Sequence, residues 1–169
     1  MEESFLHTCC FFGHRKIDET EELKTNLYEI TENLIVNEKV DTFLFGSKSN
    51  FDDLCHKIVT DLKEKYPYIK RIYVRAEYPY ITDWYREYLL KSCEDTYFPE
   101  KIINAGRARY VERNCEMLDK SSFCVIYYDE NYIPKKSKNS GTKIAYDYAK
   151  KKGVNVINIL EYLKKFQQG

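Results

Sequence analysis

Short apolar runs alternate with longer segments of helical period along this chain, and that alternation limits the folds open to it. The apolar runs span residues 8–12, 40–45, 69–74, 123–128 and 154–159. Because they are apolar throughout rather than at every second position, they are typical of strands covered on both faces. Sheets of that kind are mainly parallel, and helices connect one strand to the next.

The segments between these runs carry apolar residues at intervals of three and four. This spacing predicts helices over residues 18–37, 50–65, 108–120 and 141–152, and a short closing helix that ends near Phe166. The tyrosine-rich stretch 77–97 is only partly helical in pattern. With right-handed crossovers, this order predicts an α/β, Rossmann-like, doubly wound fold, in which helices flank a mainly parallel sheet on both faces.

The chain has the length of one domain. It contains 169 residues, and we find neither internal repeats nor a linker rich in Pro, Gly and Ser. We therefore expect residues 1–169 to form a single domain. The acidic start lacks the pattern of a secretory signal, and no apolar run is long enough to span a membrane, so we expect no membrane association.

The six cysteines indicate the redox environment. None of them forms a Cys-x-x-Cys pair, and several lie within apolar runs. We interpret them as reduced, mostly buried thiols of a cytoplasmic protein rather than as disulfides or ligands of a metal ion. The sequence predicts neither a metal site nor a cofactor.

The charges are balanced. Lys plus Arg and Asp plus Glu both number 27, so the formal net charge is zero. Proteins that bind nucleic acid by neutralising phosphates normally show a basic excess or a basic face. The balance therefore disfavours nucleic acid as a partner and favours a small ligand that is held by local charges.

A glycine turn follows the first apolar run. In Gly13-His14-Arg15, the glycine permits a sharp turn and a close backbone approach, and Arg15 can pair with a phosphate through two N–H groups. Parallel sheets bind ligands at this end of their strands. The alternative is a plain turn that ends the strand and leaves the arginine solvated.

A second glycine loop follows the second run, from Gly46-Ser47 to Asp52, and opens a helix. Ser49 or Asn50 can cap this helix, whose free N–H groups would attract a phosphate or a ribose. Capping alone explains those two residues but leaves Gly46 unexplained, which favours a ligand role. The Gly-Lys-Ser/Thr ending of a P-loop is absent.

The helix over residues 110–120 directs polar groups toward its apolar side. Asn114 falls inside the apolar stripe and Arg113 lies on its edge. A buried amide without partners costs about 1–3 kcal/mol, so Asn114 either holds a neighbouring loop or reaches a ligand. The stripe consists of Tyr110, Val111, Cys115, Met117 and Leu118.

A third helix start, Ser140-Gly141-Thr142, offers a cap and a close backbone approach for an anion. The alternative is that these residues only cap the helix. Lys135, Lys136 and Lys138 precede them, and solvation is the commoner role of such lysines.

Residues 66–97 hold eight tyrosines and the only tryptophan, Trp84. Aromatic faces can stack on a nucleobase, but a second core layer or a dimer contact is the commoner use. In the same stretch, Arg75 and Glu77 follow the third run and could hold a ribose hydroxyl or pair with each other.

Taken together, the motifs at residues 11–15, 46–52, 112–119 and 140–142 form an ordered set. The set resembles the SLOG superfamily, named for the Smf/DprA and Lonely-guy proteins, and within it a small branch with a Phe-x-Gly-His-Arg start. The likeness runs from about residue 8 to residue 159. It implies a Rossmann-like fold that binds nucleotides or nucleotide-derived ligands through the two glycine turns and the loop before Thr142.

The resemblance also bears on catalysis. Lonely-guy enzymes cleave the base from a nucleoside monophosphate with an arginine and a glutamate, and the resemblance places Arg113 at that arginine and Ala145 at that glutamate. Alanine can neither stabilise an oxocarbenium ion nor transfer protons. An N-glycosidic hydrolase would need another carboxylate beside Arg113, namely Glu112 or Asp119.

We therefore expect a binding module that senses or sequesters a phosphate-bearing nucleotide or nucleotide-derived ligand, without catalysis, at the carboxyl ends of the strands. We also expect a homodimer, formed through the tyrosine-rich stretch. The alternatives are an N-glycosidic nucleotide hydrolase and single-stranded DNA binding, which the neutral charge disfavours. The expected ligand-binding residues are Gly13, His14, Arg15, Gly46, Ser47, Asp52, Arg113, Asn114, Ser140, Gly141 and Thr142.

Overall fold

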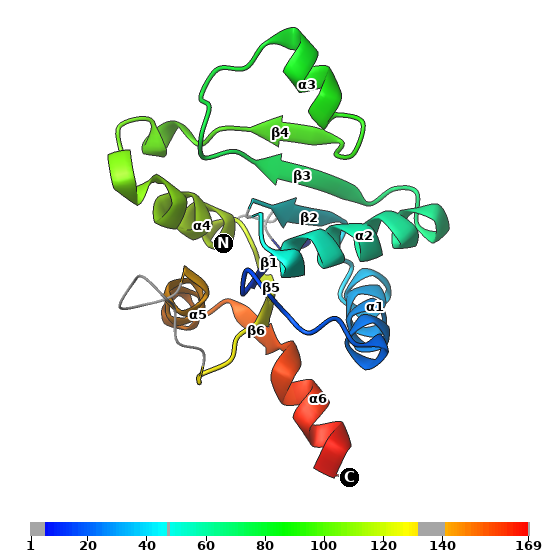
Figure 1. The fold of residues 1–169 in the computed structure, drawn as a ribbon. Helices are drawn as coiled ribbons and strands as arrows, with labels where there is room; N and C mark the ends of the chain where they lie inside the picture. Colours follow the sequence, from blue (N-terminus) through cyan, green and yellow to red (C-terminus); the bar gives the residue numbers. More distant parts are fainter. Residues whose placement is uncertain (1–5, 47, 132–140, 169) are drawn as a thin grey trace.

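The computed structural model describes residues 6–46, 48–131 and 141–168 (Figure 1). Strands and helices alternate along them. The strands are β1 (Thr8–Gly13), β2 (Thr42–Phe45), β3 (Lys70–Val74), β4 (Asp95–Tyr97), β5 (Phe123–Tyr127) and β6 (Asn155–Asn158). The helices are α1 (Glu21–Val36), α2 (Asn50–Lys65), α3 (Asp83–Leu89), α4 (Arg109–Asp119), α5 (Gly141–Lys152) and α6 (Ile159–Gln168), with 3-10 turns at Glu100–Ile102 and Gly106–Ala108.

The six strands form one parallel sheet in the order β4-β3-β2-β1-β5-β6. The chain starts at β1 in the interior of the sheet, builds outward to β4, and then returns to the other side of β1 to add β5 and β6. The direction of winding thus changes between β1 and β5. This arrangement confirms the doubly wound, Rossmann-like fold that the sequence predicts.

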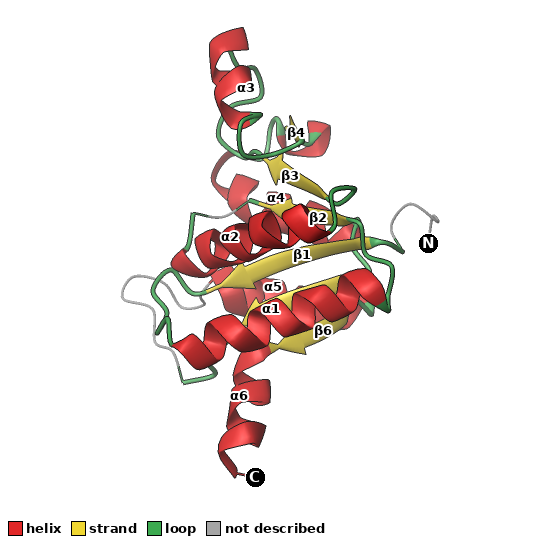
Figure 2. Ribbon diagram, turned by 90° about the vertical axis from the view of Figure 1, so that its right-hand side faces the viewer, coloured by secondary structure: helices red, strands yellow, loops and turns green. Residues whose placement is uncertain are grey.

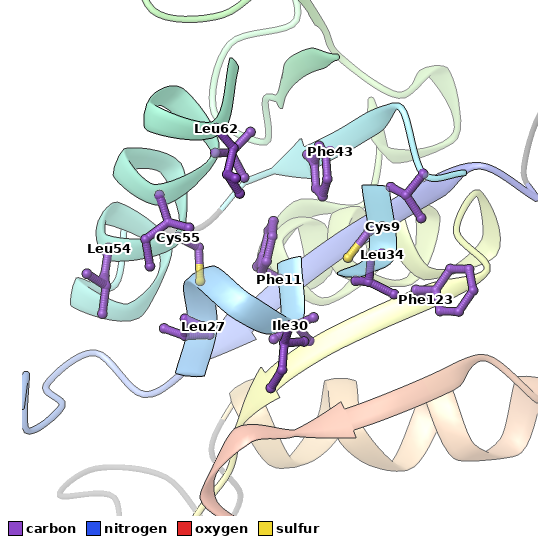
Figure 3. Close-up of a cluster of buried hydrophobic side chains, with 14 of the residues drawn as sticks. Cys9, Phe11, Leu27, Ile30, Leu34, Phe43, Leu54, Cys55, Leu62 and Phe123 are labelled. Atoms are coloured by element: carbon purple, nitrogen blue, oxygen red, sulfur yellow. The ribbon is translucent and has the colours of Figure 1, made fainter. Parts of the chain in front are cut away.

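Helices cover both faces of the sheet (Figure 2), and β1 contributes to the two cores in alternation. Cys9 and Phe11 pack in the core beneath α1 and α2, whereas Cys10 and Phe12 pack in the core beneath α4 and α5. In the first core, Phe11 and Phe43 lie with their ring centroids 5.9 Å apart, in the same cluster as Leu27 and Leu34 from α1 (Figure 3). Burial on both faces explains why the strand segments are apolar without alternation.

Hydroxyl side chains begin three of the helices. Thr20, Ser49 and Thr82 each accept a hydrogen bond from the backbone N–H three residues later. Such caps satisfy a helix N–H that has no partner within the helix. The starts of α1, α2 and α3 therefore follow from local sequence chemistry.

The six cysteines are all free; five are buried and Cys115 is partly exposed. In the part of the chain that the structure describes, no helix is long and apolar enough to cross a membrane.

The tyrosine-rich stretch differs most from expectation. It contains α3 and the short strand β4. The sequence does not predict β4, because a strand of three residues forms no recognisable apolar run. None of the α3 residues is buried, and Trp84 is 73% exposed. The stretch therefore does not form a second core layer around Trp84. Smaller differences lie at β5 and β6, which end one residue earlier than predicted.

Candidate functional site

The carboxyl edge of the sheet gathers the turns that the sequence singles out. Gly13 ends β1, Gly46 follows β2, and Arg75 follows β3. Helices α2, α4 and α5 begin near this edge because each runs back across the sheet after a strand. The lateral spacing of parallel strands, about 4.8 Å, places turns that are distant in sequence next to one another.

Arg113 connects these turns. Its guanidinium is buried, and Nη1 donates to the carbonyl oxygens of Gly46, at 2.6 Å, and Val74, at 3.3 Å. These two carbonyls lie where β2 and β3 end, so no neighbouring strand in the described part of the chain supplies an N–H for them. The Arg113 side chain donates to them instead. Burial lowers the pKa of Arg113, opposed by the charges of Tyr73 and Asp52. Arg113 thereby ties α4 to the ends of two strands.

Asn114 supports the same arrangement, since its Oδ1 accepts a hydrogen bond from Arg113 Nε at 2.9 Å. The predicted apolar stripe of α4 was wrong in part: Arg113 and Glu116 are buried, Val111 and Cys115 are only partly buried, and Tyr110 is exposed. Arg113 is buried because the pair of strand-end carbonyls requires a donor at that place.

Both glycine turns are required by packing within the protein. A Cβ atom at Gly46 would lie 2.8 Å from Met117 Sδ and 2.9 Å from Arg113 Cδ. A Cβ atom at Gly13 would lie 2.4 Å from the Phe51 side chain. The close approach that the sequence indicates is therefore the approach of Phe51 and Arg113, and it does not itself require a ligand.

The start of α2 is occupied by the protein's own acceptors. The N–H of Asn50 donates to the Arg15 carbonyl at 2.9 Å, and those of Asp52 and Asp53 donate to Ser49. The buried Asp52 carboxylate accepts from the Gly46 N–H at 3.3 Å. The prediction that these N–H groups are free for a phosphate is thus wrong, because Ser49 and Asp52 have structural roles here.

His14 joins the two strands at which the winding changes. Its ring is buried, and Nε2 accepts a hydrogen bond from the backbone N–H of Asp129 at 3.0 Å, so Nδ1 carries the proton. Burial lowers the pKa of His14, although the Asp129 carboxylate opposes the shift. His14 therefore fixes the loop after β5 to the turn after β1. The neighbouring Arg15 side chain is exposed.

The start of α5 differs from the start of α2. Its first turn carries no acidic residue, and a Cβ atom at Gly141 would meet nothing within 4 Å. Thr142 is buried. Two of the predicted binding residues, Ser47 and Ser140, lie outside the described residues.

Beside Arg113 lies a group of side chains that the sequence does not predict to meet. We call it the edge cluster, and it consists of Lys48, Glu77, Arg109 and Tyr110. The Tyr110 hydroxyl donates to Glu77 Oε1 at 3.3 Å, and Lys48 Nζ lies 3.6 Å from the same oxygen. The Arg109 and Arg113 guanidinium carbons lie 5.0 and 5.9 Å from the Tyr110 ring centroid. The sequence indicates Glu77 as a candidate for binding, but its helical spacing predicts a core position for Tyr110, and no pattern distinguishes Lys48.

Glu77 raises the pKa of Lys48 through its charge, which indicates that the two groups interact at the surface. Arg75 does not pair with Glu77, one of the alternatives that the sequence leaves open. Its guanidinium donates instead to Thr96 Oγ1 and to the carbonyls of Tyr78 and Pro79.

The carboxylates proposed for a hydrolase do not join this group. Asp119 accepts hydrogen bonds from Tyr148 at 2.8 Å and Lys101 at 3.2 Å. It lies six residues beyond Arg113, about 9 Å along the helix. Glu112 is exposed on α4, and Ala145 is buried in the core between α5 and the sheet.

The edge cluster is suited to binding. An aromatic ring can stack on a base, a carboxylate can accept hydrogen bonds from sugar hydroxyls, and cations can pair with phosphate. Across residues 6–46, 48–131 and 141–168, no group of three His, Cys, Asp or Glu side chains could hold a metal ion.

Comparisons with known proteins bear on the fold. No family profile matches the sequence, and no curated protein matches it either. A solved structure of DNA processing protein A from Helicobacter pylori, described as binding single-stranded DNA in a unique mode, is similar with a TM-score of 0.56. The two chains are 12% identical, and the alignment covers 97% of this chain and 74% of that one. The chain thus shares its fold with a DprA protein.

This similarity corrects the expectation that nucleic acid is disfavoured as a partner. A protein with this fold binds single-stranded DNA, so neither the fold nor a balanced charge total excludes nucleic acid. The physical reason is that net charge averages the whole surface, whereas binding depends on the groups at one place and on stacking.

Proposed function

We propose that this chain binds a phosphate-bearing nucleotide or nucleotide-derived ligand at the carboxyl edge of its sheet, without catalysing its cleavage. The observation that carries the proposal is the edge cluster, in which the Tyr110 ring, the Glu77 carboxylate and the cations Lys48 and Arg109 meet at one surface. These are the group types that a base, a ribose and a phosphate require. The resemblance to the SLOG superfamily supports the same proposal.

Exposure separates the binding groups from the supporting ones. Tyr110 and Arg109 are exposed, the side chain of Lys48 is largely exposed, and Glu77 is partly exposed. Arg113, Asp52 and Gly46 are buried and hydrogen-bonded to one another, and the Arg113 guanidinium carbon lies 5.9 Å from the Tyr110 ring centroid. We therefore assign contact with ligand to the first group and positioning to the second.

The test is a thermal-unfolding screen of the intact chain against nucleoside mono-, di- and triphosphates, cyclic nucleotides and ADP-ribose-type compounds. We expect at least one of them to raise the melting temperature. Tyr110→Ala and Glu77→Gln should remove most of that rise. Glu38→Gln should retain it, because Glu38 is exposed in the loop before β2, at the opposite edge of the sheet. A screen without any rise at millimolar concentrations would contradict the proposal.

A second candidate is single-stranded DNA binding, which the similarity to DNA processing protein A favours. Nucleotides within a strand offer the same bases, sugars and phosphates as free ones. Fluorescence anisotropy with a labelled single strand, at rising salt concentrations, tests this candidate. Self-association and a cytoplasmic location stay predictions made from the sequence.

A further inference from the structure

The segment between β3 and β4 presents a connected row of aromatic rings, which we call the aromatic ladder: Tyr78, Trp84, Tyr85 and Tyr88. Trp84 stacks on Tyr88 with centroids 6.1 Å apart and planes at 12°. Tyr88 stacks on Tyr85 at 6.2 Å, and Tyr85 meets Tyr78 edge-on at 6.4 Å. Trp84 and Tyr88 remain 73% and 58% exposed. Monomeric proteins seldom leave so much aromatic surface in water without a use.

The ladder is exposed but firmly held. Arg75 is buried, and it donates to Thr96 Oγ1 and to the carbonyls of Tyr78 and Pro79, which precede α3. On the far side, Ser92 contributes its carbonyl to a 2.8 Å hydrogen bond with His56 of α2. Both ends of an otherwise unburied helix are therefore anchored to the body. A helix whose position is fixed before binding loses little conformational entropy when its side chains bind.

The ladder adjoins the edge cluster, because Tyr78 of the ladder directly follows Glu77 of the cluster along the chain. Tyr85 lies close enough to Lys48 and Tyr73 to affect the pKa of both groups. Lys48 in turn contacts Glu77, which accepts from Tyr110. Figure 1 shows α3 beyond β4, at one lateral end of the sheet. The aromatic surface thus runs from the proposed nucleotide site outward along α3.

A second copy of this chain is a poorer occupant of the ladder. The seven residues of α3 span only about 10 Å, whereas a stable dimer buries about 800 Å² on each partner. Charged Asp83, Arg86 and Glu87 also separate the rings along the helix, so the face lacks the apolar centre of such an interface.

We propose that the aromatic ladder is a stacking platform for bases of a single-stranded nucleic acid, and that it extends the nucleotide site along the strand. The proposal rests on the function proposed above. Stacking accepts any base, because every base has a π face. It also needs few phosphate contacts, which agrees with a chain of zero net charge.

The experiment uses the intact chain and an oligothymidylate of about 20 nucleotides, a length that exceeds one stacking platform. Trp84 is the only tryptophan, so its fluorescence reports directly on the ladder. We expect the oligonucleotide to quench that emission, and we expect a duplex of equal length to bind at least about tenfold more weakly because its bases are already stacked.

Variants identify the rings responsible. Trp84→Leu and Tyr88→Leu should each weaken oligonucleotide binding, measured by anisotropy, about fivefold or more. Tyr68→Ala is the matched control, since Tyr68 is 59% exposed but lies outside the ladder, and it should bind as the unmodified chain does. Because α3 contributes no buried residue, these variants should fold normally, and circular dichroism verifies that they do.

Unchanged affinity in the double variant Trp84→Leu/Tyr88→Leu would overturn the ladder proposal. If that variant also turned a dimer into a monomer in sedimentation, the ladder would be a contact between copies instead. Mononucleotide stabilisation distinguishes the two proposals: ladder variants should retain it, whereas Tyr110→Ala should lose it. Loss of mononucleotide binding in the ladder variants would contradict the separation of the two sites.

Discussion

Two buried arginines, Arg113 and Arg75, bind backbone carbonyls at the carboxyl edge, and they differ in the solvent exposure of the residues next to them. Arg113 donates to the carbonyls of Gly46 and Val74, and the turns around it are tightly packed against Met117. Arg75 donates to the carbonyls of Tyr78 and Pro79, and the rings beyond it are open to solvent. A buried guanidinium that satisfies backbone carbonyls is thus a positioning device, and the exposed groups beside it are the candidates for binding.

The largest effect should come from Arg113→Ala. The substitution leaves two strand-end carbonyls without their donor in a buried place, so we expect the free energy of unfolding to fall by about 3 kcal/mol. Urea denaturation measures it. Arg107→Ala, at an exposed position on the turn before α4, should change the free energy by less than about 0.5 kcal/mol. Equal stability of the two variants would show that Arg113 is not the tie between α4 and the sheet.

Gly46→Ala should have the next largest effect. Its new Cβ would lie within 3 Å of both Met117 and Arg113, and relieving such contacts in a packed region costs about 1–3 kcal/mol. Gly141→Ala is the matched control, because its Cβ would meet nothing within 4 Å. A Gly46→Ala variant as stable as Gly141→Ala in urea would mean that the glycine is present for some reason other than packing.

Arg75→Ala should destabilise the chain by about 1–2 kcal/mol, less than Arg113→Ala, because two of its three acceptors, the carbonyls of Tyr78 and Pro79, lie in a loop near solvent. Its more specific effect should be on the ladder: the fluorescence anisotropy of Trp84 should fall as α3 loses one of its anchors. Arg86→Ala, a substitution within α3 itself, is the control, and we expect it to leave the fluorescence anisotropy of Trp84 unchanged. Retained anisotropy in Arg75→Ala would remove the positioning role.

Acid should weaken the junction between β1 and β5. Burial lowers the pKa of His14 in the folded chain, so the unfolded chain takes up a proton first, and the free energy of unfolding should fall as the pH drops below about 6.5. His14→Gln, which keeps an acceptor for the Asp129 N–H, should flatten that part of the pH profile. Hydrogen bonds to Arg71 lower the pKa of Glu94, so this carboxylate affects the free energy of unfolding only at lower pH. An identical profile in both proteins would exclude His14 as the cause.

The smallest effect should be that of Trp84→Ala on stability. Since α3 buries none of its residues, the free energy of unfolding should change by less than about 0.5 kcal/mol in urea. A loss of several kcal/mol would mean that the ladder is structural, and it would weaken the case for a binding surface.

The fold and the starts of several helices could be predicted from the sequence because their signals are local. The apolar runs and the three-to-four spacing depend on neighbouring residues only, and Ser49 caps α2 through a contact three residues away. The two glycines were also identified correctly as special positions. The packing that requires glycine at these positions could not be predicted, since Phe51 and Arg113 contact the two glycines from other elements.

The candidate site was predictable in place but not in composition. Doubly wound sheets bind ligands at the carboxyl edge, and the turns at Gly13 and Gly46 lie there. The grouping of Lys48, Glu77 and Tyr110 could not be predicted, because these residues come from three separate segments and only Glu77 carried any signal. Glu112 and Asp119, close to Arg113 in sequence, lie away from its guanidinium because the helix turns them to other directions.

The sequence by itself determined the alternation of strands and helices, the parallel sheet and the edge at which the candidate site lies, since side-chain periodicity is decided over a few residues. Only the tertiary structure decided that Arg113 is buried while Tyr110 is exposed, and that Trp84 and Tyr88 lie open on α3. The need for a donor at the Gly46 and Val74 carbonyls arises only once β2 and β3 end side by side. No local pattern contains that requirement, because it belongs to groups that are brought together by folding.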